Sequence, residues 1–292
     1  MGGSTKLSRK VWSKSILIYW NGCSFVQGME VENIKDQFVS LVSEEFNQDW
    51  IRHSKVGGSN DRIHRCVIDD FCNNSKGVLG APGDTRIRTS NIISYAPEGH
   101  KADLAIILWS GINRMEYLNS ITNTWRQSAW VRHRMAPSYP FKLSNDSHIH
   151  YHPDMTRSMH GALEGYCKNV RFGTANLLQS LNYMISVKYI LESKGIPYLF
   201  YNLSDGQINP VKETIDKKRL EGANVTWENQ QLNWAQYCKE LPHLEGEGFY
   251  DMCKRNNVPF GPKDHPLEEG NRLMANRIIK DIYDKNLDKV FN

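Results

Sequence analysis

A serine near the N-terminus and a histidine near the C-terminus are the residues of this chain best suited to nucleophilic chemistry. Ser24 follows Gly22 and Cys23 directly after a short apolar segment, and His265 precedes a proline close to the end of the chain. A serine hydroxyl is a poor nucleophile until a neighbouring base takes its proton, and an imidazole can do this near neutral pH. We therefore predict that Ser24 is a nucleophile and that His265 is its base and later its acid.

Two further clusters supply groups that would stabilise a developing negative charge. They are Gly57-Gly58-Ser59-Asn60 and Gly111-Ile112-Asn113. The backbone N–H groups of Ser24 and Gly57 and the side-chain amide of Asn113 would be three donors for an oxyanion. A glycine at position 57 lets the backbone approach a substrate without a Cβ in the way.

Each of these residues also has an ordinary structural interpretation. Ser24 suits a turn or a helix cap, Gly57 suits a turn, and Asn113 is a turn former that tolerates a left-handed backbone. His265 would in that case cap the last helix. Cys23 lies beside the predicted nucleophile, and we expect it to pack inward as a small hydrophobic residue. The occurrence of all four clusters in this order favours the catalytic interpretation.

Short apolar segments alternate with amphipathic segments, which is the pattern of a parallel sheet covered by helices on both faces. Strands are expected at 15–20, 50–56, 103–109 and 198–201. Apolar residues at helical spacing predict helices over 34–46, 60–71, 178–194 and 267–282, with a further helix near 228–241. Ligands of open α/β sheets bind beyond the carboxyl ends of the strands, where the first three clusters lie.

The rhythm of strands and helices is interrupted in three places, which we interpret as insertions in a single domain. They lie near 74–100, 115–165 and 205–262, and a loop as long as the second is usually functional or disordered. Residues 1–14 are rich in Gly, Ser and Lys and are expected to be a flexible N-terminus. The domain is then expected to span residues 15–292.

The four clusters resemble the SGNH/GDSL hydrolase family, which is named for a Ser, a Gly, an Asn and a His in separate sequence blocks. Gly22-Cys23-Ser24 matches the Gly-Asp-Ser turn of the first block. Gly57 matches the second block, with Gly58 as the alternative, and Gly111-Ile112-Asn113 and His265 match the other two. The resemblance covers residues 15–283 apart from the insertions. It implies an α/β protein with a flavodoxin-like three-layer α/β/α sandwich and a mainly parallel sheet. It also implies a serine esterase that forms an acyl-Ser24 intermediate and needs no metal or organic cofactor.

The chain departs from the family pattern at two positions. Where the family has an Asp three residues before the His, this chain has Pro262. Asp264 is the nearest candidate for a third catalytic residue, although a side chain adjacent to His265 is expected to point elsewhere. Asp251 or a backbone carbonyl would be an alternative, and a Ser–His dyad is another. The third block usually continues with Asp, whereas this chain has Arg114.

Several residues are candidates for substrate binding. Arg114 would contact an acidic substrate or pair with a carboxylate such as Glu116, and we favour the structural role. The 115–165 insertion interleaves aromatic residues with arginines, and Trp125 and Trp130 would stack on sugar rings. The alternative is that these aromatic residues only pack the insertion onto the domain. The aromatic content gives a weak preference for a glycan ester over another small-molecule ester.

Three histidines in the same insertion invite comparison with a metal site. His148, His150 and His152 would share one face of an extended segment, but only Asp154 lies near them as a further ligand. We therefore predict no metal site and interpret the segment as a surface or substrate-contacting loop. The six cysteines form no CxxC pair, and without a secretory signal they are expected to be reduced thiols.

Composition excludes several other classes of function. The chain has 292 residues and a net charge of +4, which is too small to indicate a nucleic-acid partner. No apolar run is long enough to cross a membrane, and no signal peptide is apparent, so a cytoplasmic location is expected. The alternatives to an esterase are a non-catalytic binding or structural module of the same fold and an acyltransferase that uses the same Ser and His. The sequence does not indicate which acyl group the substrate carries or what the oligomeric state is.

Overall fold

The computed structural model describes residues 17–72, 85–88, 102–112, 114–119, 124–128, 173–204, 226–227, 230–231 and 240–291. Its centre is a five-stranded sheet in the order β3-β2-β1-β4-β7. The strands are β1 (Leu17–Gly22), β2 (Asp49–Ser54), β3 (Thr85–Arg88), β4 (Leu104–Trp109) and β7 (Tyr198–Asn202). All neighbours pair in parallel except β2 and β3, which are antiparallel.

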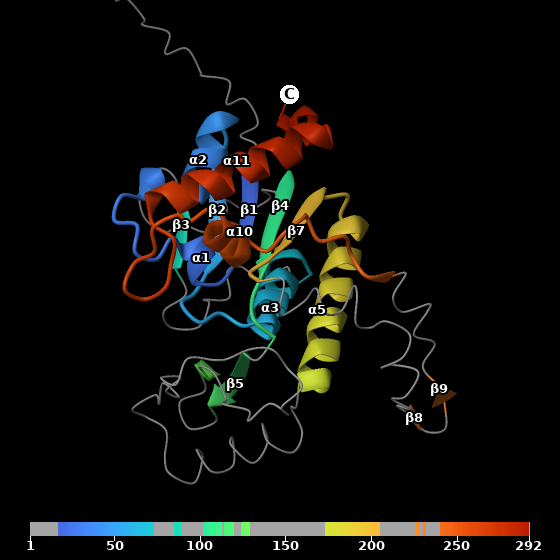
Figure 1. The fold of residues 1–292 in the computed structure, drawn as a ribbon. Coiled ribbons are helices and arrows are strands. Elements are labelled where there is room, and N and C mark those ends of the chain that lie inside the picture. The colour runs from blue at the N-terminus through green and yellow to red at the C-terminus, as the bar shows by residue number, and fades with distance from the viewer. Residues whose placement is uncertain are drawn as a thin grey trace, which may run out of the picture.

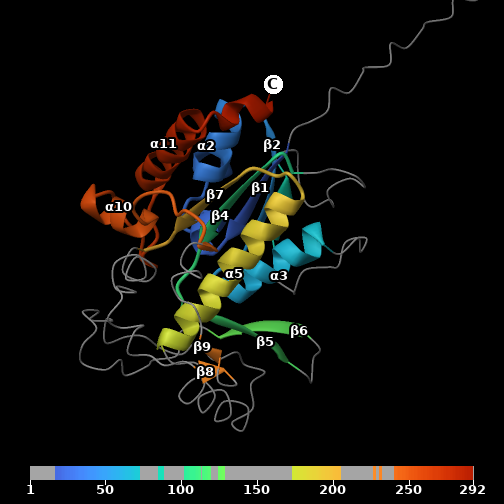
Figure 2. The same ribbon diagram turned by 90° about the vertical axis from the view of Figure 1, so that its right-hand side faces the viewer.

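Helices cover both faces of this sheet, as Figures 1 and 2 show. One layer holds α2 (Phe38–Glu45), α10 (Phe249–Arg255) and α11 (Glu268–Asp284), and the other holds α3 (Asn60–Phe71) and α5 (Gly173–Ser193). Alternate residues of each strand point to opposite faces, so Ile18 and Trp20 join the first layer, whereas Tyr19 joins the second. The predicted α/β class, three layers and mainly parallel sheet are confirmed.

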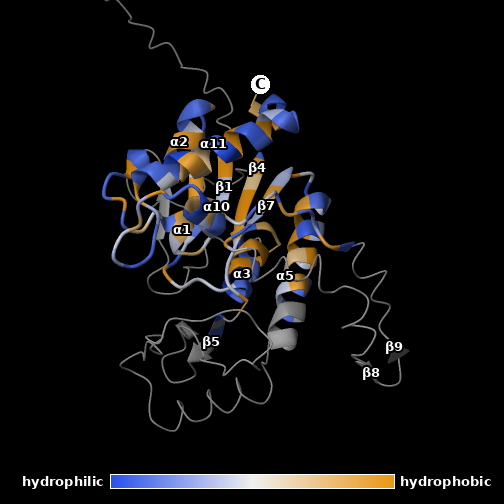
Figure 3. Ribbon diagram, viewed as in Figure 1, coloured by the Kyte–Doolittle hydropathy of each residue, from blue (hydrophilic) through white to orange (hydrophobic). Residues whose placement is uncertain are grey.

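The core strands are buried on both faces. Every residue of β1 and of β4 is buried, and β4 is largely apolar in Figure 3. Continuous apolar sequence is expected for strands covered by helices on both sides. The carboxyl ends of the parallel strands lie together, because Gly22 pairs with Ser54 and Trp109 pairs with Asn202. This edge receives α1 (Ser24–Gln27), which follows β1.

The expected helix over 34–46 is interrupted in the structure. A 3₁₀ turn covers Ile34–Asp36, Gln37 is extended with φ −75° and ψ 139°, and α2 begins at Phe38. The break turns the Gln37 side chain into the protein, where it donates to the carbonyls of Gly28 and Val31. Helical periodicity alone did not indicate this break.

The end of α5 agrees with its predicted stop signal. Gly195 has φ +64°, the N–H of Ile196 donates to the carbonyl of Leu191 at 3.0 Å, and the N–H of Gly195 donates to that of Glu192 at 3.0 Å. This is a Schellman motif, which favours glycine at the left-handed position. The chain then enters β7.

The three segments interpreted as irregular contain regular elements. β3 lies within 74–100, and a hairpin of β5 (Met115–Asn119) and β6 (Thr124–Ser128) lies within 115–165. The helix expected near 228–241 is wrong at its start, because β8 (Thr226–Trp227) and β9 (Gln230–Gln231) pair as antiparallel strands there. β3 forms by pairing with β2, which is more than 30 residues earlier in the chain, whereas β5–β6 and β8–β9 are local antiparallel pairs. The segments 1–14 and 232–239 lie outside the described residues, and the single-domain division stays a prediction.

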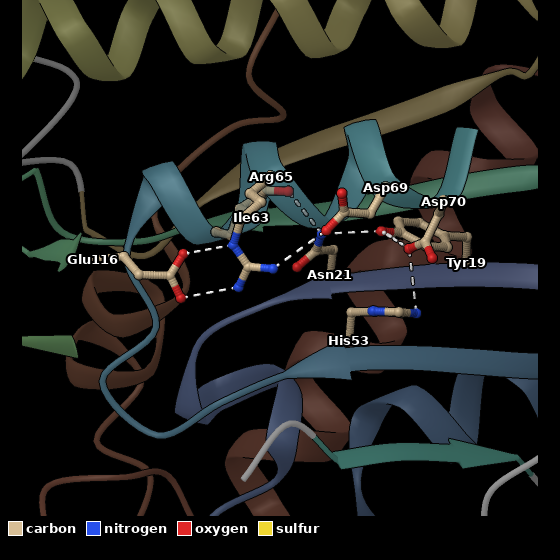
Figure 4. A network of polar contacts seen from close by, with 8 residues as sticks. All are labelled: Tyr19, Asn21, His53, Ile63, Arg65, Asp69, Asp70 and Glu116. Carbon is tan, nitrogen blue, oxygen red and sulfur yellow. Dashed lines mark hydrogen bonds and ion pairs between the residues drawn. The ribbon is translucent and has the colours of Figure 1, made fainter. Parts of the chain in front are cut away.

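A polar network between α3 and the sheet joins the second layer to β1 and β2 (Figure 4). Asp70 of α3 accepts from the Tyr19 hydroxyl at 3.1 Å and lies 3.3 Å from Nε2 of His53. Asn21 donates to the Tyr19 hydroxyl and to the Ile63 carbonyl. Arg65 holds Glu116 of β5 through two bonds of 2.8 and 3.0 Å, so α3 also fixes the start of the hairpin.

Asn60 fixes the start of α3 to the end of β4. Its side-chain oxygen accepts from the Ser110 N–H at 2.7 Å, and its amide nitrogen donates to the Ser110 carbonyl at 3.0 Å and to the Ser180 hydroxyl at 3.1 Å. All three residues are buried. We expect Asn60→Ala to lower the free energy of unfolding by about 2–4 kcal/mol, because buried backbone groups of Ser110 lose their partners.

Denaturant unfolding followed by circular dichroism would measure this change. The exposed helix variant Glu44→Ala is the control and should change the free energy of unfolding by less than about 0.5 kcal/mol. Equal values for the two variants would contradict a stabilising role for Asn60.

Candidate active site

The nucleophile candidate lies at a tight junction between β1 and α1. Ser24 is the first residue of α1 and is only 3% exposed. A Cβ on Gly22 would lie 2.4 Å from a methyl carbon of Val26 and 3.0 Å from the Leu108 carbonyl oxygen, so only glycine lets α1 fold back here. Cys23 is fully buried in the core of the first layer, which confirms that it packs inward.

A short loop before α11 brings His265 to this junction. The N–H of Gly261 donates to the His265 carbonyl at 2.9 Å, and the N–H of Leu267 donates to the Pro259 carbonyl at 3.0 Å. These bonds present the imidazole so that its Nε2 lies 2.7 Å from the Ser24 Oγ. The two residues that the sequence predicted as nucleophile and base are therefore in hydrogen-bond contact across 241 positions of the chain.

A glutamate that the sequence analysis did not single out holds the other ring nitrogen. Oε2 of Glu30 lies 3.2 Å from Nδ1 of His265 and also accepts from the His265 backbone N–H at 3.1 Å. Its Oε1 accepts from the Lys263 N–H at 2.8 Å. The side chains of His265 and Glu30 are 12% and 10% exposed. Ser24, His265 and Glu30 thus have the arrangement of nucleophile, base and orienting acid that a serine hydrolase requires.

The signal for Glu30 was weak in the sequence. It lies six positions after Ser24 in a polar segment, with no spacing rule to distinguish it from Glu32. In the structure it has φ 70°, a left-handed backbone that is uncommon for residues other than glycine. This conformation occurs where the surrounding contacts hold the residue in place, and the three bonds to the His265 loop provide such contacts.

The structure corrects the expectation for Asp264. Its carboxylate accepts from the Tyr250 hydroxyl at 2.7 Å and from Lys254 Nζ at 3.1 Å, and its side chain is 61% exposed. Asp264 has φ 60°, and its position next to His265 directs its side chain to this outer pair, while Glu30 takes Nδ1. Asp251, the other acid considered, lies on α10.

The electrostatics of the pair favour a neutral imidazole and a charged carboxylate. Burial lowers the pKa of His265 below its ordinary value of 6.5; Glu30 and Asp264 oppose this shift, and Arg114 adds to it. Burial tends to raise the pKa of Glu30, but hydrogen bonds from the Lys263 and His265 N–H groups and from the imidazole bring it below its ordinary value of 4.5. A neutral imidazole is the form that can accept a proton from Ser24.

The structure describes two of the three expected oxyanion donors, Ser24 and Gly57. Ser24 is the first residue of α1, where N–H groups have no acceptor within the helix. Gly57 has φ 72° in a turn closed by the bond of 2.9 Å from the Gly58 N–H to the Lys55 carbonyl. A Cβ on Gly58 would lie 3.2 Å from the Gly22 oxygen and 3.3 Å from the Cys23 Cα, so this turn packs against the nucleophile junction. Asn113 lies outside the described residues.

Arg114 has structural contacts beside the site. Its Nη1 donates to the Ser110 hydroxyl at 2.8 Å and to the Gly58 carbonyl at 3.5 Å. The Glu116 carboxylate, which we considered as a partner for Arg114, accepts two hydrogen bonds from Arg65. Trp125 pairs with Leu118 in the β5–β6 hairpin, and Trp130 lies outside the described residues.

Two further points from the sequence concern metal binding and membrane spans. His148, His150 and His152 lie outside the described residues. Within the described part of the chain, no three His, Cys, Asp or Glu residues are grouped to hold a metal ion. Among the helices that the structure describes, none has the length and apolar character needed to cross a membrane.

Replacing Glu30 by glutamine tests its role at the imidazole. Because the Glu30 carboxylate raises the pKa of His265, Glu30→Gln should lower that pKa further. Titration of the His265 ring signals by NMR measures the effect, and the exposed neighbour Glu32→Gln is the control. A His265 pKa that is the same in both variants would contradict the contact.

Comparison with known proteins gives structural similarity only. No family model matches the chain, and no curated protein matches it in sequence. The fold is similar to that of a carbohydrate esterase, with TM-score 0.47 and 13% identity over 96% of this chain and 68% of that one. It is also similar to a lipolytic protein of the G-D-S-L family from Desulfitobacterium hafniense DCB-2, with TM-score 0.42 and 11% identity over 91% and 99% of the two chains.

A third similar structure is an acetyl xylan esterase from the rumen bacterium Butyrivibrio proteoclasticus, with TM-score 0.41 and 9% identity over 94% of this chain and 66% of that one. At these identities and TM-scores the similarity concerns the fold, and the chemistry of this chain is inferred from its own residues.

Proposed function

We propose that this protein is a serine esterase of SGNH type. The observation that carries this proposal is the continuous contact from Ser24 Oγ through both nitrogens of His265 to the Glu30 carboxylate, at 2.7 and 3.2 Å. Glu30 takes the place of the Asp that the family pattern has before its histidine. The nucleophile is buried beside a neutral base, and the acid that orients this base is charged.

The proposed reaction proceeds in two steps. The Ser24 Oγ attacks the ester carbonyl carbon while Nε2 of His265 takes its proton, and the imidazolium then gives this proton to the departing alcohol oxygen. The acyl group is left on Ser24. A water molecule, deprotonated by the same Nε2, attacks the acyl carbon, and the proton returns to Ser24 Oγ as the acid is released. Glu30 stabilises the imidazolium in both steps.

The oxyanion of each tetrahedral intermediate would be held by the N–H groups of Ser24 and Gly57 and by the amide of Asn113. The Gly58 N–H is already donated to Lys55, which favours Gly57 as the glycine donor. Arg114 supports the turn through the Gly58 carbonyl, so the structural role favoured for it is also the one we propose. No metal or organic cofactor enters these steps.

For the substrate we propose an acyl ester on a carbohydrate or another small molecule. The β5–β6 hairpin, which contains Trp125, begins directly after the segment 111–114 beside the nucleophile junction. We propose that Trp125 and Trp130 of the aromatic-rich 115–165 segment stack on sugar rings of the substrate. A non-catalytic module and an acyltransferase are the competing functions. Covalent labelling and turnover distinguish the non-catalytic module from an enzyme.

The nucleophile is tested by covalent labelling together with turnover. Wild type should react with a fluorophosphonate probe and hydrolyse p-nitrophenyl acetate, whereas Ser24→Ala should lose the label and roughly 10³-fold or more of kcat. Cys23→Ala is the matched control, because its side chain is buried in the core and should leave the labelling intact. A wild type that neither labels nor turns over would favour the binding module.

The pH dependence of the same reaction tests the base. His265 must be neutral to take the Ser24 proton, so kcat/KM should rise with pH as the imidazole loses its proton. Because burial lowers the pKa of His265, the midpoint of this rise should lie below 6.5. A midpoint above 6.5, measured with an ester whose own ionisation is constant over the range, would contradict the assigned environment of the base.

A further inference from the structure

A buried arginine lies beneath the site with no catalytic contact of its own. Arg52 of β2 is 2% exposed, and its Nη1 donates to the Gln37 Oε1 at 2.6 Å and to the Val26 carbonyl at 3.2 Å. Among the described residues, no carboxylate contacts the Arg52 guanidinium. Burial lowers the pKa of its guanidinium to about 10, so it keeps its charge at neutral pH. Burying a cation without an anionic partner is costly, which calls for a compensating role.

The two acceptors of Arg52 belong to the two segments that follow β1. Val26 lies in α1, the short helix that begins at Ser24. Gln37 is held by Arg52 so that its amide nitrogen faces the segment between α1 and the 3₁₀ turn. That nitrogen donates to the Gly28 carbonyl at 3.3 Å and to the Val31 carbonyl at 3.2 Å.

These two carbonyls bracket the turn that carries Glu30. The N–H of Val31 donates to the Gly28 carbonyl at 3.2 Å, which closes residues 28–31 into a turn with Glu30 inside it. Gly28 has φ 69°, and a Cβ there would lie 2.2 Å from the Gln37 side-chain carbon. Gln37 therefore packs directly onto the turn and bonds to both of its ends.

We propose that Arg52 and Gln37 are positioning residues that set the Glu30 turn and thereby the orientation of the His265 imidazole. This inference rests on the proposed function, because it assigns Glu30 to the orientation of the catalytic base. Arg52 fixes the Gln37 amide, Gln37 fixes both ends of the turn, and the left-handed Glu30 directs its carboxylate to Nδ1. The same guanidinium holds Val26, so one buried cation links the helix of the nucleophile to the turn of the acid.

The positioning role of Gln37 can be distinguished from a general effect on stability, because Gln37 acts on His265 through Glu30. Charged groups that act on His265 are Glu30 and Asp264, which raise its pKa, and Arg114, which lowers it. Asp264 and Arg114 are held by Tyr250, Lys254, Ser110 and Gly58, and none of these contacts Gln37 in the structure. A change that loosens the 28–31 turn should therefore alter the pKa of His265 only through Glu30.

The experiment is a double-mutant cycle between Gln37→Met, which keeps the side-chain volume, and Glu30→Gln. The His265 pKa by NMR and the fluorophosphonate labelling rate are measured in the wild type, both single variants and the double variant. Gln37→Met should lower the His265 pKa, as Glu30→Gln does, and slow labelling roughly 10- to 100-fold. In the double variant the two effects should not add, because the second change acts on a contact that is already lost.

Ser43→Ala is the matched control, since it removes a buried hydrogen bond of 2.9 Å to the Val39 carbonyl within α2. It should leave the His265 pKa and the labelling rate unchanged. If Gln37→Met does not fold, Gln37→Asn keeps the amide one methylene short of the turn and should shift both readouts in the same direction.

Additive effects in the cycle, or a His265 pKa unchanged by Gln37→Met, would overturn the positioning role. Failure of the proposed function would give a different result, because the wild type would then not react with the fluorophosphonate probe. The double-mutant cycle measured by NMR needs no turnover, so it would still show whether Gln37 acts on His265 through Glu30.

Discussion

The Glu30 carboxylate joins the first loop of the sheet to the segment before the last helix, and the site depends on this junction. It accepts from two backbone N–H groups and lies against the imidazole, across 235 positions of the chain. A carboxylate at 10% exposure would be costly without partners, and these three donors compensate for the loss of water. Because two of them are main-chain groups, the carboxylate fixes the backbone of the His265 loop as well as its ring.

The sheet determines where this junction can form. β1 lies between β2 and β4 in parallel register, so the loops after these strands meet at one edge of the sheet. Gly22 permits the sharp entry into α1, and the Gly57–Gly58 turn packs against the same backbone. Asn60 then fixes the loop after β4 to the start of α3. The site is thus supported by close packing of neighbouring loops and by the side chain of Asn60, which bonds to the backbone of Ser110.

Buried polar groups serve different purposes on the two faces of the sheet. On the α3 face, Tyr19, His53 and Asp70 form a network that joins the helix to the strands (Figure 4). On the α2 face, Arg52 and Gln37 lead from the core to the Glu30 turn. Both sets are expensive to bury, and both connect elements that hydrophobic packing alone would allow to slide. The second set ends at the contact between Glu30 and His265, which is why we propose a positioning role for it.

Local patterns in the sequence predicted the layers of the fold and singled out two of the three residues that we propose for the site. Continuous apolar strands, amphipathic helices and glycine stop signals are local patterns, and Ser24 and His265 lie in recognisable clusters at predicted strand and helix ends. Tertiary structure alone decided that the Glu30 carboxylate lies at the imidazole of His265, that Gln37 breaks the helix expected over 34–46, and that β3 pairs with β2. These features depend on contacts between residues far apart in the chain. An acid within a turn has no periodicity to distinguish it in the sequence, and only the fold places an imidazole nitrogen 3.2 Å from its oxygen.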